Sequence, residues 1–275
     1  PAITIPSEIC IEAGDTLHLK VLAKDPNLGD TLVLSAVSGM FTIAAPTPLF
    51  AQPAIGTDSA SSFFTWMPNC SQLRIQPYTV LFKARDNGKP VNLFDLKTLR
   101  IKVIAPAPKN TSAIATGISV NLNWDAGYCN KVAGYKIYTK ENPNPFTSDT
   151  CETGMPDGKG YSLIKTTTDT TTFFNDNTTI LGKNYCYRIV AYYANGAESK
   201  VSQEVCVELK KVVPAILNVS INNTSATNGS VFLKWMKATD LDVPQHPGPY
   251  SYRVYRNSGT LVASIFNVND TSVVD

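Results

Sequence analysis

Six cysteines are the residues of this sequence with the clearest chemistry, and they are Cys10, Cys70, Cys129, Cys151, Cys186 and Cys206. None of them lies in a CxxC pair, the spacing that many zinc sites and thioredoxin-like redox sites use. An even number of cysteines at hairpin and loop spacings instead indicates disulfides, and disulfides indicate an oxidising compartment. The cysteines therefore predict an extracellular protein stapled by three bridges.

Local spacing favours one set of three pairs among the many that six cysteines allow. The expected pairs are Cys10–Cys70, Cys129–Cys151 and Cys186–Cys206. The last pair lies nearly symmetrically about Asn195-Gly196, a dipeptide suited to a tight hairpin turn, so folding back brings the two sulfurs together. The alternation of the same strand predicts that Cys186 and Arg188 lie on its outer face.

Catalysis has little support, because an enzyme needs an acid, a base or a nucleophile that converge. The two histidines are His18, which alternates with leucines and should face solvent, and His246 in a proline-rich loop. A disulfide-bonded cysteine cannot act as a nucleophile. The carboxylates are scattered over turns and strand ends. We therefore predict no catalytic residues and no enzymatic activity.

Hard oxygen ligands near residues 12, 25–30 and 86–87 suggest a calcium site, since Ca²⁺ prefers carboxylate and amide oxygens. The candidate ligands are Glu12, Asp25, Asn27, Asp30 and Asp86, with Asn87 beside them. Calcium is the only cofactor that the sequence suggests. In the other interpretation, which describes most loops, these side chains only hydrogen-bond the backbone of their own turns.

Two adjacent tyrosines, Tyr192 and Tyr193, lie near the tip of the last hairpin, where one of them should point outward. An exposed aromatic ring can stack on a sugar or anchor a protein partner. It can equally stabilise the sheet through a cross-strand pair. The tyrosines are the candidate binding residues of the sequence.

Composition argues against nucleic-acid binding and against a membrane-spanning segment. Only 17% of the residues are charged and the net charge is +2, so the chain lacks the basic field that nucleic-acid binding needs. No apolar run approaches the ~20 residues that cross a bilayer, so we expect no transmembrane segment.

Period-two alternation runs along most of the chain, and no helical stripe of three turns is present. Examples are Tyr78, Val80 and Phe82 in one segment and Leu122 with Trp124 in another. Turn residues recur about every ten residues, which is typical of antiparallel sandwiches. The fold class is therefore predicted as all-β, built of tandem antiparallel β-sandwiches. Proline-rich joints near 106 and 212 divide it into domains 1–105, 106–211 and 212–275.

An internal repeat supports this division. The sequence SVNLNW at 119–124 recurs as SVFLKW at 230–235, and YKIY at 135–138 recurs as YRVY at 252–255. The third range stops before any counterpart of the 185–206 hairpin, so its domain is incomplete at its C-terminal end. Either the sequence ends in mid-domain, which we favour, or another segment or chain completes the domain.

These motifs resemble known families. Trp124, the YKIY strand and Tyr185 in a tyrosine-corner position resemble a fibronectin type III domain over about 107–210. Residues 1–105, with the motifs AKDPNLGD, WMP and ARDNG, resemble bacterial cadherin-like or immunoglobulin-like surface domains. The two resemblances together imply that the tandem sandwiches are immunoglobulin-like or fibronectin type III β-sandwiches. In cadherin-like domains comparable acids bind calcium at the domain tip beside the linker, although the interdomain DxNDN segment of that family is absent here.

A more specific resemblance covers about 119–275. The segments CNKVAGYKIY, CETGMP and YCYRIVAYYANGAES are similar to fibronectin-type repeats of gliding-motility-associated surface proteins of the Bacteroidota. That resemblance implies type IX secretion and an extracellular location at the outer membrane. It also implies a non-catalytic role in adhesion or gliding, or as a rigid spacer. The implied partners are other domains of the same large protein, with a surface polysaccharide or an outer-membrane protein as further candidates.

The alternative function is an accessory region of a secreted polysaccharide-degrading enzyme, which would bind carbohydrate or space a catalytic domain. A row of exposed aromatic residues on one sheet face would favour it.

Overall fold

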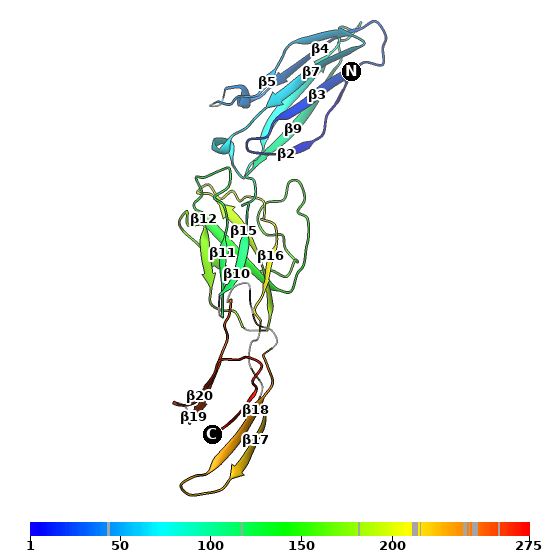
Figure 1. Cartoon of the computed structure of the whole chain (residues 1–275). Helices are drawn as coiled ribbons and strands as arrows, with labels where there is room; N and C mark the ends of the chain where they lie inside the picture. Colours follow the sequence, from blue (N-terminus) through cyan, green and yellow to red (C-terminus); the bar gives the residue numbers. More distant parts are fainter. Residues whose placement is uncertain are drawn as a thin grey trace. The chain divides into compact units, whose positions relative to one another are not determined.

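The computed structural model describes the chain except for residues 43, 44, 117, 181, 211–213, 215, 239, 240, 242, 244–246 and 258. The described residues form an all-β protein of tandem sandwiches (Figure 1), which confirms the predicted fold class. The predicted joint near 212 and the candidate His246 lie outside the described residues. No helix of the described part is long and apolar enough to span a membrane.

Residues 1–105 form a sandwich of two sheets. The four-stranded sheet has the order β1-β3-β7-β5, and the five-stranded sheet has the order β2-β9-β8-β4-β6. The strands are β1 (Ala2–Thr4), β2 (Glu8–Glu12), β3 (Leu17–Lys24), β4 (Thr31–Val37), β5 (Leu49–Phe50), β6 (Ala54–Thr57), β7 (Ser59–Trp66), β8 (Tyr78–Arg85) and β9 (Phe94–Ile104). Two short 3-10 helices, η1 (Gly39–Thr42) and η2 (Cys70–Gln72), follow β4 and β7.

Strict alternation explains the core of this sandwich. Strand β8 buries every second residue, so Tyr78, Val80 and Phe82 face inward as predicted, while the side chains between them are exposed. Phe64 of β7 meets Phe82 edge to face, with ring centroids 6.1 Å apart. Strand β2 runs parallel to β9, with Cys10 opposite Lys102. This register places Cys10 near the end of β9 that leads out of the sandwich.

The middle range also carries two sheets, with the orders β10-β11-β14 and β13-β12-β15-β16. Its strands are β10 (Ser112–Thr116), β11 (Ser119–Asn123), β12 (Gly134–Glu141), β13 (Ser162–Thr166), β14 (Phe173–Asp176), β15 (Asn184–Tyr192) and β16 (Val205–Glu208). Trp124 follows β11 and packs edge to face on Tyr135 of β12, with ring centroids 5.2 Å apart. The hydroxyl of Tyr185 accepts a hydrogen bond from the backbone N–H of Ile180, as expected of a tyrosine corner.

The last range repeats part of this pattern. Its sheets have the orders β17-β18-β21 and β19-β20, built from β17 (Ile216–Asn223), β18 (Ser230–Trp235), β19 (Tyr252–Arg256), β20 (Thr260–Ile265) and β21 (Ser272–Val274). Trp235 packs on Tyr252 at 5.3 Å, almost as Trp124 packs on Tyr135. The described part of this range contains no counterpart of β15 or β16. A cavity of about 460 Å³ lies among its apolar side chains, including Leu233 and Trp235.

The chain forms two compact units that do not follow the predicted boundaries. The first comprises Pro1–Ala113, Leu122–Phe174 and Cys186–Cys206, and the second comprises Ile114–Asn121, Asn175–Tyr185 and Val207–Asp275. The first sandwich thus belongs to the same unit as much of the middle range. The division into three domains stays a prediction.

Candidate functional site: disulfide bridges and an acidic cluster

All six cysteines are oxidised, but two of the predicted pairs are wrong. The bridges are Cys10–Cys151, Cys70–Cys129 and Cys186–Cys206, with S–S distances of 2.03, 2.05 and 2.01 Å. Only Cys186–Cys206 was predicted correctly. The other two predicted pairs, Cys10–Cys70 and Cys129–Cys151, each lay within a single predicted domain. In the structure both of these bridges instead join the first sandwich to the middle range.

The two joining bridges start from different parts of the first sandwich, one from a strand and the other from a 3-10 helix. Cys10 lies on β2 of the five-stranded sheet, and the Nζ of neighbouring Lys102 donates a hydrogen bond to the carbonyl of Cys151 at 3.3 Å. Cys70 begins η2, which directly follows β7 of the four-stranded sheet. Its partner Cys129 is only 2% exposed. Both bridges lie entirely within the first compact unit.

The segment 142–161, which connects β12 to β13 and carries Cys151, is held by a buried arginine of β15. Arg188 is 5% exposed and donates hydrogen bonds to the carbonyls of Ser202 (2.9 Å) and Phe146 (3.3 Å). Its guanidinium carbon also lies 4.0 Å from the centroid of the Phe146 ring. The prediction that Cys186 and Arg188 lie on an outer face was therefore wrong, because this segment covers that face of β15.

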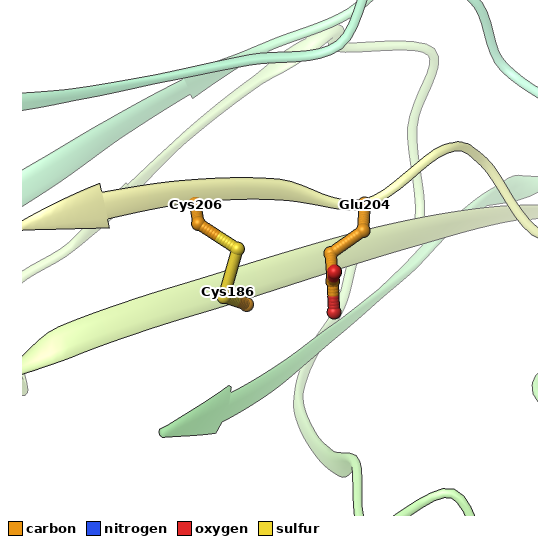
Figure 2. A group of neighbouring side chains, drawn as sticks. All are labelled: Cys186, Glu204 and Cys206. Carbon is orange, nitrogen blue, oxygen red and sulfur yellow. A yellow bond between two sulfur atoms is a disulfide. The ribbon is translucent and has the colours of Figure 1, made fainter. Parts of the chain in front are cut away.

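Glu204 lies beside the third disulfide (Figure 2). It also forms hydrogen bonds with two residues of the segment 142–161. Its carboxylate accepts hydrogen bonds from the backbone N–H of Asn144 at 3.0 Å and from the hydroxyl of Tyr161. Ligand atoms of Cys186, Glu204 and Cys206 all lie within 4.8 Å of one another. The two sulfurs are bonded to each other, however, and the sulfur ligand of a metal is a thiolate. With the disulfide intact, this group serves packing and not metal binding.

The two candidate binding tyrosines differ in exposure. Tyr193 is 8% exposed and its hydroxyl donates to the carbonyl of Cys129, so the prediction of a binding role was wrong for this residue. Tyr192 is half-buried, and its hydroxyl donates to the carbonyl of Thr167 at 2.7 Å. A binding role for Tyr192 stays a prediction.

Burial raises the pKa of Tyr193 to about 12, from an ordinary value of 10.0. The unfolded chain then ionises this phenol at a lower pH than the folded chain does. Its contribution to stability is complete below about pH 10 and is lost as the pH rises toward 12. Urea unfolding at pH 8 and at about pH 11.5 gives the free energy of unfolding at each pH. We expect this free energy to fall less between the two pH values in Tyr193→Phe than in the parent protein. An equal loss in both proteins would contradict this assignment.

Three of the predicted metal ligands come together at one end of the first sandwich. Asp25 follows β3, Asp30 precedes β4 and Asp86 follows β8, and carboxylate oxygens of the three lie within 4.8 Å of one another. The side chain of Asp25 is 1% exposed. One of its oxygens accepts the backbone N–H of Asn27 at 2.9 Å, and the other lies 3.0 Å from the amine of Pro1.

Hydrogen bonding lowers the pKa of Asp25. The N–H of Asn27 is the largest cause, and the Pro1 amine adds to it against the opposing effect of burial. Asp86 is held by the backbone N–H groups of Leu93 (2.7 Å) and Gly88 (3.2 Å). Backbone donors therefore keep two carboxylates of the cluster, those of Asp25 and Asp86, in place.

The remaining predicted ligands do not all join this cluster. Glu12 lies opposite Ile104, at the other end of β9 from Asp86, and pairs with Lys200 at 3.0 Å. Glu12 was therefore wrongly included, because its place in the sequence concealed that β2 ends at the opposite end of the sandwich. The side chain of Asn87 accepts the N–H of Thr31. A ligand role for the exposed Asn27 stays a prediction.

His18 is exposed as predicted and stacks on Phe63, with ring centroids 4.4 Å apart.

Comparisons with known proteins show no family for this chain, and the similarities to solved structures are low. No family model matches the chain, and no curated protein matches it. Among solved structures, a two-domain fibronectin type III segment of chicken tenascin has 12% identity and a TM-score of 0.36, covering 75% of this chain and 96% of that one. Domains A168–A170 of titin have 16% identity and a TM-score of 0.30, covering 76% and 66%. A structure described as a myokine has 17% identity and a TM-score of 0.30, covering 38% and 98%. Similarity at this level carries no argument about function, so the arrangement of the strands and disulfides has to supply it.

Proposed function

We propose that this chain is a non-catalytic extracellular segment of a large bacterial cell-surface protein, where it acts as a rigid spacer in adhesion or gliding. The observation that carries the proposal is that all six cysteines form disulfides within tandem sandwiches. Disulfides persist in oxidising compartments, and they stabilise domains that no chaperone can refold. Resemblance to gliding-motility-associated proteins of the Bacteroidota supports a type IX-secreted protein held at the outer membrane.

Two experiments test this proposal. Antibodies raised against residues 1–206 should label intact cells that make the protein, and trypsin added to those cells should remove the label. Labelling that appears only after the cells are opened would contradict a surface location. Native gels cast with soluble polysaccharides should show unchanged migration of the purified chain, because a spacer needs no sugar site.

Retarded migration in such a gel would instead favour the accessory region of a polysaccharide-degrading enzyme. Tyr192 is the residue to change in that case, since its ring is the half-buried candidate for stacking on a sugar. Loss of the retardation in Tyr192→Ala would assign the sugar site to this ring. Tyr193→Phe is the matched control because its ring is buried.

We also propose that Asp25, Asp30 and Asp86 bind calcium. Three carboxylates within 4.8 Å repel one another, and a divalent cation would remove that repulsion. In the structure the amine of Pro1 supplies a positive charge to Asp25. A residue added before Pro1 would turn this amine into an amide without charge or proton, and the cluster would then lack its cation.

We therefore expect calcium, compared with a chelator, to raise the melting temperature of the N-terminally extended chain by several degrees. The shift should be smaller in the chain that begins at Pro1, and it should vanish in the extended Asp86→Asn variant. Equal melting temperatures with calcium and with chelator in the extended chain would contradict a calcium site.

A further inference from the structure

The three disulfides are nested in a way that sets how tension passes through the chain. Cys70 and Cys129 both lie between Cys10 and Cys151 in the sequence, so the Cys70–Cys129 bridge is enclosed in the Cys10–Cys151 loop. The Cys186–Cys206 bridge follows that loop without overlapping it. A pull on the chain ends therefore has a covalent path that leaves the backbone at Cys10 and rejoins it at Cys151.

That path omits most of the first sandwich and of the middle range. The Cys10–Cys151 bridge bypasses 141 residue steps and the Cys186–Cys206 bridge bypasses 20. Between Pro1 and Cys206, less than a quarter of the backbone, counted in residue-to-residue steps, then remains in the path of tension and can be extended by a pull. Strands β3 to β9 all lie inside the bypassed loop, so backbone tension between the chain ends does not run through them.

We propose that this segment is a load-bearing element in which Cys10–Cys151 diverts tension around strands β3 to β9, so that only β1 and the start of β2 of the first sandwich stay in the path of the load. The inference deepens the proposed spacer function and rests on it for its biological setting. A spacer of cell-surface machinery has to transmit force without lengthening, and a covalent bypass limits lengthening by topology.

Contacts at the joint reinforce the bypass. The Nζ of Lys200 lies 3.0 Å from a carboxylate oxygen of Glu12, two residues after Cys10. The backbone N–H of Lys200 also donates to the carbonyl of Ala105 at 3.0 Å. Asn195 donates its side-chain N–H to the carbonyl of Leu73 at 2.6 Å. The first sandwich is thus held at the end of β2, just after β9 and just after η2, in addition to its two disulfides.

The enclosed Cys70–Cys129 bridge has a separate role in this scheme. It adds nothing to the bypass, because both of its cysteines are already outside the path of tension. It instead attaches η2, which connects β7 to β8, to the segment before β12. We expect this bridge to stabilise the joint between the first sandwich and the middle range. Its removal should therefore leave the contour length of the unfolded chain unchanged, whereas removal of Cys10–Cys151 should increase it.

Single-molecule force spectroscopy on the full oxidised chain, held at its two ends, tests the proposal. Cys10→Ser/Cys151→Ser should gain about 280 Å of contour length on complete unfolding, at roughly 3.4 Å per residue. The variant releases the 141 steps of the Cys10–Cys151 loop, but the intact Cys70–Cys129 bridge still bypasses 59 of them. The remaining 82 steps account for the gain. Cys186→Ser/Cys206→Ser should gain about 70 Å, from its 20 steps.

The Cys70→Ser/Cys129→Ser variant is the matched control, since it removes a disulfide that joins the same two parts yet should leave the contour length unchanged. A length gain in that variant would overturn the proposal, and so would a Cys10→Ser/Cys151→Ser variant that unfolds to the length of the parent. Neither result depends on sugar binding or on cell-surface labelling, so this inference and the proposed function can fail separately.

Discussion

Replacing Cys10 and Cys151 together with serine is expected to lower the free energy of unfolding of the first compact unit by about 4.5 kcal/mol, the largest effect expected among the three disulfides. A disulfide restricts the unfolded chain, and the restriction grows with the length of the loop that it closes. With the enclosed Cys70–Cys129 bridge intact, this bridge closes a loop of 82 residue steps (141 less 59), against 59 for Cys70–Cys129 and 20 for Cys186–Cys206. The same relation gives about 4 and 3 kcal/mol for the two shorter loops.

Urea unfolding followed by tryptophan fluorescence measures this order, since Trp66 and Trp124 both lie in the first compact unit. The serine pairs should rank by loop length, with Cys186→Ser/Cys206→Ser the mildest. A larger loss for this last pair than for Cys10→Ser/Cys151→Ser would show that packing around β15 matters more than chain entropy.

Changing Arg188 to alanine is expected to lower the free energy of unfolding by roughly 2–4 kcal/mol and to free the segment 142–161. The variant loses the hydrogen bonds to the carbonyls of Ser202 and Phe146 and the stacking on the Phe146 ring, all at a site that is 5% exposed. The two carbonyls lose a charged donor, and the truncated side chain leaves a cavity.

Limited proteolysis separates this local effect from global unfolding. We expect cleavage between residues 142 and 161 to accelerate in Arg188→Ala under conditions where the rest of the chain resists. Arg188→Lys should recover only part of the loss, because an ammonium group lacks the planar fork that both donates to two carbonyls and stacks on a ring. Lys165 is exposed on β13, so Lys165→Ala serves as the control: it removes a positive charge without removing a buried contact. An unchanged cleavage rate in Arg188→Ala would contradict the role given to this arginine.

Much of the fold could be predicted because its determinants are local. Alternation of the kind seen in β8 depends only on neighbouring residues, and it placed Tyr78, Val80 and Phe82 in the core correctly. The repeat of SVNLNW and YKIY as SVFLKW and YRVY predicted two equivalent units, and the two tryptophan–tyrosine contacts have nearly the same geometry. The turn at Asn195-Gly196 similarly predicted the Cys186–Cys206 bridge.

Features that depend on distant segments were predicted poorly. The partners of Cys10 and Cys70 lie beyond the first sandwich, and spacing along the chain gives no measure of which ends of two sandwiches meet. Glu12 was assigned to the wrong end of its sandwich for the same reason. The burial of Arg188 could not be derived from its strand alone, because a segment some 40 residues earlier covers it. An arginine in the middle of an otherwise apolar strand was the available signal.

The central claim, that two disulfides join the first sandwich to the middle range, is tested most directly by mapping disulfides in a proteolytic digest of the unreduced protein by mass spectrometry. The structure predicts one linked peptide pair that contains Cys10 with Cys151 and another that contains Cys70 with Cys129. Recovery of Cys10 with Cys70 and of Cys129 with Cys151 would contradict the account, because each part would then be stapled only to itself and tension would pass through the first sandwich.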